Sequence, residues 1–409
     1  MSCHWFAFPS GFRLRTSNLN RLLESILILA VFLLLSACAM HQPDRPDHDP
    51  AAGREAGSLF HRDGYAVSRP EFAVQTWDAD YLLVGEGHAS SCDHRVQAGL
   101  IQTLASFGTR PVVGLEMVDV TRQEVLDRFN HGDLSLDALP KALEWNATWG
   151  YDFELYAPIF ETAQRLALPL RALNLPRRVI DAVKTGSVAD LNATDASLVP
   201  SDIIPPSEEQ QDALKEQFRQ HRSLLSSAGS TLERFFLVQS LWDTQMAMQS
   251  VVARQELARP VVVIAGSGHV ERGWGIALRL DRLDPGARVV TVVPWRGMTD
   301  PDPREGEYRF YCPLSHTSRL GYTLSVSFDG IEVTVVQPDS RAAEAGLMAG
   351  DVIGSVAGEK VTALWQLHQA ATQARRQGGL LEMTVVRDGT AVSVSFDLQD
   401  TGPEPPGDD

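Results

Sequence analysis

The stretch that decides the fold is Tyr81-Leu82-Leu83-Val84-Gly85-Glu86-Gly87-His88, an apolar run that ends in a carboxylate and an imidazole among glycines. The same pattern returns far along the chain as Val262-Val263-Ile264-Ala265-Gly266-Ser267-Gly268-His269. Short apolar runs of this kind, bounded by glycine, are typical of buried strands. Because glycine permits a sharp turn and a close approach, each pattern predicts a strand that delivers a histidine to a crevice at its carboxyl end. Two such histidines indicate one shared site.

Strand-like and helix-like segments alternate through most of the chain. The expected strands are 81–84, 111–115, 170–173, 261–265 and 289–293, with amphipathic stretches between them. This alternation predicts an α/β fold, in which a mostly parallel sheet is covered by flanking helices.

Polar side chains follow each of the expected strands. They are Glu86 and His88, then Glu116, Asn174 and His269, and finally Trp295 with Arg296. Open parallel sheets bind ligands at the carboxyl edge of their strands, so we expect these five segments to contribute to one rim. Asn174 is equally consistent with a turn residue, because a proline follows two positions later.

Two expected helices add polar candidates. A helix that begins near residue 90 carries His94 and Gln97, and its positive end favours an anion at the rim, although His94 alone would be typical of a surface residue. The largely apolar segment 234–248 places Gln239 and Asp243 four residues apart on one face. A carboxylate on such a helix needs a partner, so Asp243 either bonds backbone groups or orients one of the two histidines.

The N-terminal region predicts export. Arginines precede an apolar run over 26–35, which is short for a membrane span and ends in small residues, so residues 1–37 are typical of a signal peptide. The ending Leu35-Ser36-Ala37-Cys38 resembles a bacterial lipobox, which implies a lipid such as palmitate on Cys38. Residues 38–64 are expected to form a flexible tether, because their first part is rich in Asp, Pro, His and Arg.

Charge and cysteine content limit the partners. Loss of residues 1–37 removes three arginines and one glutamate, which changes the formal net charge from −16 to −18, so we expect no nucleic-acid partner. After lipidation of Cys38 only Cys92 and Cys312 remain as thiols. They could pair in an oxidising compartment, but the sequence does not give their distance.

Several motifs in a fixed order together resemble the ChaN family of haem-binding lipoproteins, over roughly residues 65–300. They are Gly85-Glu86-Gly87-His88 with His94 and Gln97, Gly114-Leu115-Glu116-Met117, the region from Trp149 to Tyr156, Asn174-Leu175-Pro176-Arg177, Gln239-Ser240-Leu241-Trp242-Asp243, and Gly266-Ser267-Gly268-His269. The resemblance implies an α/β domain with a small helical subdomain, in a haem-binding protein of the bacterial outer membrane that serves iron uptake. It also implies kinship with the Tiki and TraB proteins, whose Gly-x-x-His motifs are associated with metal-dependent peptide hydrolysis.

Two functions therefore compete. For haem, which the resemblance favours, the cofactor-binding candidates are His88, His94, Tyr156, Asn174, Gln239, Asp243 and His269. For hydrolysis, a divalent ion such as Mn, Co or Zn would be held by Glu86, His88, Glu116 and His269, with Glu86 or Glu116 as catalytic base. A third reading is a scaffold with a vestigial site.

The C-terminal part resembles a bacterial PDZ domain over residues 316–398, after an expected linker at 299–315. Alternating segments at 322–328 and 331–336 flank Asp329-Gly330, which is a strong hairpin signal. Leu320, Gly321 and Tyr322 occupy the place of the loop that binds a peptide's terminal carboxylate. Residues 399–409 are typical of a disordered tail.

The sequence thus predicts a lipid-anchored protein of the cell envelope, with a ChaN-like domain at 65–298 and a mainly-β PDZ domain. The expected partners are the membrane through Cys38, haem or a haem-delivering protein, and a peptide or protein C-terminus at the PDZ domain. A homodimer is compatible with this organisation.

Overall fold

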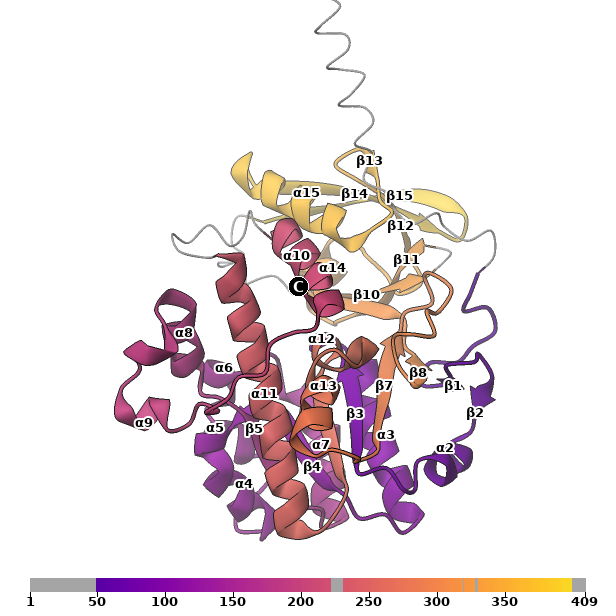
Figure 1. Ribbon diagram of the computed structural model, residues 1–409. Coiled ribbons are helices and arrows are strands. Elements are labelled where there is room, and N and C mark those ends of the chain that lie inside the picture. Colours follow the sequence, from indigo (N-terminus) through magenta and orange to yellow (C-terminus); the bar gives the residue numbers. More distant parts are fainter. Residues whose placement is uncertain (1–48, 222–230, 319, 328–329, 399–409) are drawn as a thin grey trace, which may run out of the picture. The chain divides into compact units, whose positions relative to one another are not determined.

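A computed structural model describes residues 49–221, 231–318, 320–327 and 330–398 of the chain (Figure 1). Three predicted features lie outside these residues: the signal peptide, the lipidation of Cys38 and the tail at 399–409. None of the helices within them combines the length and the apolar character that a membrane crossing needs.

The first domain is built on an eight-stranded sheet in the order β2-β1-β8-β7-β3-β6-β4-β5. The strands from β8 to β5 in this order pair in parallel, whereas β1 pairs antiparallel with β2 and β8. The strands are β1 Leu59–His61, β2 Ala66–Val67, β3 Tyr81–Glu86, β4 Val112–Asp119, β5 Leu170–Asn174, β6 Val261–Gly266, β7 Val289–Trp295 and β8 Tyr308–Tyr311. All five expected strands are present, and the predicted α/β class is confirmed.

The central strand β3 explains why its sequence is apolar throughout. Every residue of β3 is buried. Leu82 and Val84 join the hydrophobic core on one face of the sheet, and Tyr81 and Leu83 join the core on the other. A strand covered on both faces has no position for an exposed polar side chain, so it reads as a continuous apolar run.

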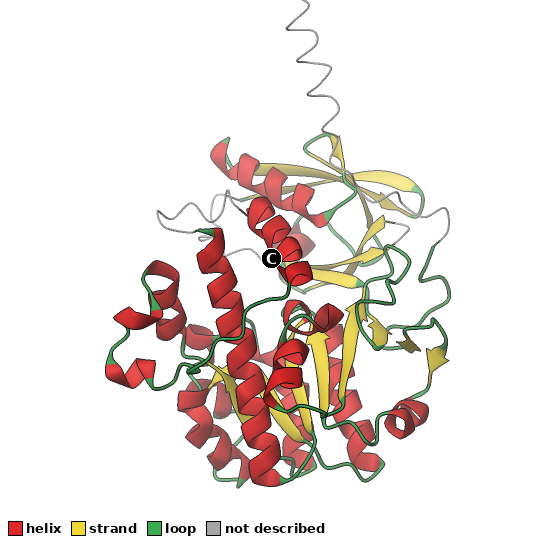
Figure 2. Cartoon of the chain, viewed as in Figure 1, coloured by secondary structure: helices red, strands yellow, loops and turns green. Residues whose placement is uncertain are grey.

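Helices supply that cover, and Figure 2 shows them on both sides of the strands. The helices of this domain are α2 Arg69–Gln75, α3 Ser91–Ser106, α4 Gln123–Asn130, α5 Leu139–Ala142, α6 Trp145–Thr148, α7 Phe153–Arg165, α8 Arg177–Thr185, α9 Ala193–Ala196, α10 Glu208–His221, α11 Leu232–Leu257, α12 Ser267–Val270 and α13 Ile276–Leu283, with short 3-10 turns at Val120–Arg122, Val188–Asp190 and Glu271–Gly273. A separate apolar cluster joins α8 to α11 through Val179, Val183 and Leu241, and it forms the core of a small helical part.

Two predicted boundaries differ from the structure. The expected tether to residue 64 contains β1, and the expected linker at 299–315 contains β8 and the beginning of β9. β8 reads Tyr308-Arg309-Phe310-Tyr311, and its first three residues are buried. Its aromatic residues extend the core past β7, whereas the prolines and charges that precede them suggested a linker.

The second domain is a seven-stranded antiparallel sheet, in the order β15-β14-β12-β11-β10-β9 with β13 beside β12. Its elements are β9 Leu314–Ser318, β10 Tyr322–Ser327, β11 Gly330–Val336, α14 Arg341–Glu344, β12 Val352–Val356, β13 Glu359–Lys360, α15 Leu364–Arg376, β14 Leu380–Arg387 and β15 Thr390–Asp397. The expected mainly-β domain with one long helix is confirmed, and it has its own hydrophobic core.

Candidate functional site

The two Gly-x-Gly-His motifs meet because their strands are neighbours. β3 and β6 pair in parallel, with Gly85 opposite Ala265 and Glu86 opposite Gly266. The segments that follow the two strands therefore leave the sheet at the same level. His88 and His269 line one cavity of about 430 Å³. The cavity therefore lies at the carboxyl edge of the sheet, where the sequence predicted a site.

The first glycine of each motif makes room for the other motif. A Cβ atom on Gly266 would lie 2.8 Å from Cε1 of His88, and a Cβ atom on Gly85 would lie 3.2 Å from Oγ of Ser267. Neither glycine has a positive φ angle, so space rather than backbone conformation requires them. Gly268, in contrast, has nothing within 4 Å of its Cβ position.

Glu86 forms the centre of a buried cluster behind the cavity. The Nδ1 atom of His88 lies 3.0 Å from Oε1 of Glu86, and the hydroxyl of Tyr156 donates to the same oxygen at 2.8 Å. His94 lies 3.1 Å from Oε2 of Glu86, and its other ring nitrogen lies 3.0 Å from the His88 carbonyl oxygen. Since acceptors face both nitrogens of His94, that ring is held as an imidazolium.

The pKa values of this cluster follow from the contacts. Burial alone would raise the pKa of Glu86, but the charge of His94 and hydrogen bonds from His88 and His94 hold it well below its usual range. Burial alone would lower the pKa of His94, yet the charge of Glu86 and bonds to Glu86, His88 and Gln97 raise it to about 9. A buried carboxylate and a buried imidazolium thus fix the orientation of His88.

His269 lies between two carboxylates. Its Nδ1 atom lies 2.6 Å from Oδ1 of Asp243, and its Nε2 atom lies 3.4 Å from Oε1 of Glu116. Burial lowers the pKa of His269, but the charges of Glu116 and Asp243 and the bond to Asp243 raise it to about 9. Asp243 is therefore a partner that orients His269, which was one of the two roles the sequence left open.

The other carboxylate oxygens of this group are also bonded. Oε2 of Glu116 accepts from the backbone N–H of Gly266 at 2.6 Å. Oδ2 of Asp243 accepts from Gln210 at 3.3 Å and lies 3.5 Å from the buried guanidinium of Arg279. These bonds hold the two carboxylates in place around His269.

The cavity has aromatic walls around His88 and a charged rim. The His88 ring packs against Trp149 and Tyr151, with ring centroids 4.8 Å and 5.1 Å apart. The full lining is His88, Glu116, Met117, Asp119, Thr148, Trp149, Tyr151, Asn174, Leu175, Arg177, Ile180, Asp181, Lys184, Trp242 and His269. The exposed cations Arg177 and Lys184 come from α8, each within 4.0 Å of Asp181.

Several predicted residues do not line the cavity. Tyr156 and His94 are fully buried behind it, and Asp243 is buried beside His269. Gln239 is partly buried on α11 and also lies outside the lining. Asn174 does line the cavity, and its side chain donates to the Glu116 carbonyl oxygen at 3.0 Å.

Tyr151 and the α8 cations were not predicted as site residues, although Tyr151 and Arg177 lie within the motifs of the family resemblance. Arg177, Asp181 and Lys184 are spaced four and three residues apart directly after β5, which places them on one helical face near the rim. That spacing was the available signal. Tyr151 lies in a loop between α6 and α7, where no periodic pattern indicates a direction.

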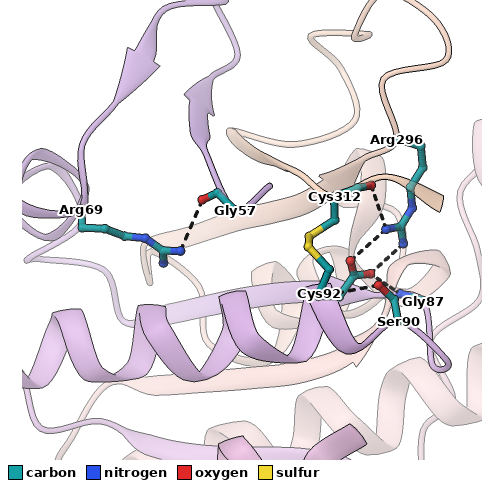
Figure 3. Close-up of a disulfide and its surroundings, with 8 residues drawn as sticks. Gly57, Arg69, Gly87, Ser90, Cys92, Arg296 and Cys312 are labelled. Atoms are coloured by element: carbon teal, nitrogen blue, oxygen red, sulfur yellow. Dashed lines mark hydrogen bonds and ion pairs between the residues drawn. A yellow bond between two sulfur atoms is a disulfide. The ribbon is translucent and has the colours of Figure 1, made fainter. Parts of the chain in front are cut away.

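A disulfide holds the loop that carries His88. Cys92 and Cys312 are bonded with their Cα atoms 5.9 Å apart, and Figure 3 shows the bond beside Arg296. The Arg296 guanidinium donates two hydrogen bonds to the buried carboxylate of Asp93, at 2.8 and 2.6 Å, and Asp93 accepts from the Gly87 N–H at 2.8 Å. The cysteines pair, so neither thiol is free to act at the cavity.

The four side chains predicted to hold a metal are near one another but are not gathered around one point. Within the described ranges, the three ligand-type side chains with atoms inside 4.8 Å of one another are Cys92, Asp93 and Cys312, and their two sulfurs are bonded to each other. Glu86 points its carboxylate at His88, His94 and Tyr156 rather than into the cavity.

Fold and site together define a two-domain protein, in which an α/β domain with a histidine-lined cavity is followed by a PDZ domain. The profile of the family described as haem-binding uptake, Tiki superfamily, ChaN matches residues 72–280, and the PDZ profile matches residues 318–398. The chain belongs to the ChaN family.

Among solved structures, similar ones are found for each of the two domains. The structure titled cofacial haem binding to ChaN of Campylobacter jejuni has 20% identity and a TM-score of 0.51, over 62% of this chain and 95% of that chain. The PDZ domain of EpsC from Vibrio cholerae has 23% identity and a TM-score of 0.17, over 19% of this chain and 95% of that chain. No curated protein matches the chain.

Proposed function

We propose that the cavity between the two Gly-x-Gly-His motifs binds haem, with His88 as the axial donor. The observation that carries this proposal is the state of the His88 ring. Its Nδ1 atom is engaged by the buried carboxylate of Glu86, and within the described residues no hydrogen bond involves its Nε2 atom. An imidazole oriented in this way presents Nε2 to a metal.

The rest of the lining fits a porphyrin. Trp149, Tyr151 and Trp242 offer flat apolar surface, and Ile180 and Leu175 add aliphatic contacts. At the rim, Arg177 and Lys184 can pair with the two propionate groups. His269 is a weaker candidate for the axial donor because carboxylates face both of its nitrogens. Bound haem would supply an iron centre for ligand binding or transfer.

A haemin titration tests the proposal. Residues 39–409 are purified and titrated with haemin while the Soret band is followed. We expect saturable binding in the wild type and a loss of affinity of at least about tenfold in His88→Ala, which corresponds to about 1.4 kcal/mol. His131→Ala removes an exposed histidine and is the matched control. Equal binding by all three proteins would contradict the proposal.

The expected homodimer is tested separately, by sedimentation of the protein with and without haemin.

A second candidate is hydrolysis with a divalent metal, and one observation favours it. The Asp243, His269 and Glu116 side chains form a connected carboxylate, imidazole and carboxylate series at the cavity wall. Such a series can accept and return a proton. Mn-, Co- or Zn-dependent peptide cleavage that is lost in both His88→Ala and His269→Ala, without haemin binding, would favour this candidate over haem.

We further propose that the protein is a lipoprotein anchored through Cys38 at the bacterial outer membrane, where it serves haem or iron uptake. The Cys92–Cys312 bond supports an oxidising compartment, and the Leu35-Ser36-Ala37-Cys38 sequence supports lipidation. Mass spectrometry of the N-terminal peptide checks the lipid. In Cys38→Ala we expect the protein to leave the membrane fraction, and an unchanged distribution would contradict the anchor.

A further inference from the structure

One strand of the C-terminal sheet lies almost entirely N-terminal to the residues that the PDZ profile matches. β9, Leu314–Ser318, begins four residues before the part of the chain that the PDZ profile matches. It pairs antiparallel along β10, with Ser318 opposite Tyr322, His316 opposite Leu324 and Leu314 opposite Val326. β11 pairs with the opposite edge of β10, so β9 covers the edge that would otherwise be free.

That edge is where a PDZ domain adds a peptide strand. The strand after the carboxylate-binding loop receives the peptide antiparallel, and the peptide's C-terminus lies at the loop. Here the loop contains Leu320 and Gly321, β10 follows it, and β9 runs antiparallel with its C-terminal residue at the loop. β9 therefore has the direction and the position of a bound peptide.

The loop donors support the same conclusion. The Leu320 N–H donates to Oγ of Ser318 at 3.2 Å, and the Gly321 N–H donates to the Ser318 carbonyl oxygen at 3.0 Å. Gly321 has a φ angle of +88°, as a loop that turns its N–H groups inward requires. Two N–H groups that could hold a terminal carboxylate thus hold Ser318 instead.

We propose that Leu314–Ser318 is an intramolecular ligand of the PDZ peptide site, and that a protein C-terminus binds there only by displacing it. The contact combines backbone pairing with a hydrogen bond of 3.1 Å between the hydroxyls of Thr317 and Thr323. Leu314 is 39% exposed, and no residue of β9 is buried. A strand with so little buried apolar surface opens locally at low cost.

An incoming C-terminus would bring what β9 lacks. Its carboxylate would make charge-assisted bonds to the Leu320 and Gly321 N–H groups, which are about twice as strong as neutral ones. β9 has the advantage of covalent attachment, which gives it an effective concentration on the order of millimolar. Competition from β9 therefore excludes peptides that bind weakly. Only partners that make additional side-chain contacts along β10 displace it. The inference does not depend on haem binding.

Two adjacent proline substitutions in the full chain form the test. Neighbouring N–H groups of a strand point in opposite directions, so one of His316→Pro and Thr317→Pro removes a donor to β10 and the other removes a donor that faces away. Each protein is titrated with a random decapeptide library that has free C-termini and with the same library amidated. Hydrogen exchange across 320–327 identifies which substitution opens the β10 edge.

We expect the variant with faster exchange to bind the free-acid library at least about tenfold more tightly than the wild type, while the other variant matches the wild type. The amidated library should bind each of the three proteins less tightly than the free-acid library does. Equal affinity of the wild type and both variants would overturn the proposal, as would an absence of binding in the variant whose β10 edge has opened. Thermal unfolding of both variants checks that the domain remains folded.

Discussion

At the residue scale, the first glycine of each Gly-x-Gly-His motif leaves room for a side chain of the other motif. Gly266 leaves room for the His88 ring, and Glu86 and its partners hold that ring from behind. The glycines therefore help to determine where the histidine rings lie. The sequence pattern repeats because two neighbouring strands end at the same edge of the sheet and turn there in a similar way.

Replacement of Gly266 by Ala should displace His88. The new methyl group would lie 2.8 Å from Cε1 of a rigid ring, so we predict a loss of stability of about 1–3 kcal/mol and a weaker haemin affinity. Gly268→Ala is the matched control, because its Cβ position is open, and its effect should stay within about 1 kcal/mol. Urea unfolding and the Soret titration measure both properties. Identical behaviour of the two variants would contradict the role given to Gly266.

The buried Glu86–His94 pair predicts a dependence of stability on pH. The pKa of His94 is raised from 6.5 to about 9, so its contribution is complete below pH 6.5 and is lost as the pH rises through about 9. The difference corresponds to about 3 kcal/mol. Glu86 acts at the acidic end, because its lowered pKa gives a contribution that is present above about pH 4.5 and is lost progressively as the pH falls below that value.

We therefore predict that the free energy of unfolding falls between pH 7 and pH 10, and that His94→Gln removes a large part of this fall. Urea unfolding across this range gives the values. Because His269 has a similarly raised pKa, some of the fall should persist in the variant. A variant with the same slope as the wild type would show that His94 is not held as an imidazolium.

At the element scale, strands β3 to β7 were predictable because each contains a clear apolar run. β3 and β6 are buried at every position. The parallel arrangement then brings Glu86, Glu116 and His269 to one edge. The sequence could not predict that Glu86 turns away from the cavity, because that depends on contacts with His94 and Tyr156, which come from two different helices. β8 and β9 were also missed, since short strands next to prolines carry little periodic signal.

The disulfide connects elements that are 220 residues apart in the sequence. It joins the first turn of α3 to the residue after β8, beside the Asp93–Arg296 pair that holds the Gly87 backbone. A cross-link over so long a loop restricts the unfolded chain strongly. The bond therefore stabilises the sheet edge at which His88 lies.

We predict that Cys92→Ala with Cys312→Ala lowers the free energy of unfolding by about 2–5 kcal/mol. Dithiothreitol should destabilise the wild type by a similar amount and leave the double variant unchanged, which separates reduction from loss of side-chain packing. Denaturant unfolding with and without the reductant provides the comparison. A wild type that is insensitive to the reductant, once mass spectrometry shows free thiols, would contradict this account.

At the scale of the whole molecule, two binding sites of different chemistry lie on one chain. The ChaN-family domain has a cavity lined by His88 and His269, for which we propose haem as the ligand, and the PDZ domain has a strand edge that its own β9 covers. Taken together, the two proposals describe a carrier of haem that also recognises protein C-termini.

Chemical rescue of the haemin spectrum tests the central claim most directly. In His88→Gly, removal of the imidazole leaves Glu86 in place, and free imidazole can occupy the vacated position. We predict that His88→Gly loses the wild-type Soret position on addition of haemin and regains it when imidazole is added, whereas His269→Gly does not depend on imidazole in this way. A wild-type spectrum in His88→Gly without imidazole would contradict the assignment of His88 as the axial donor.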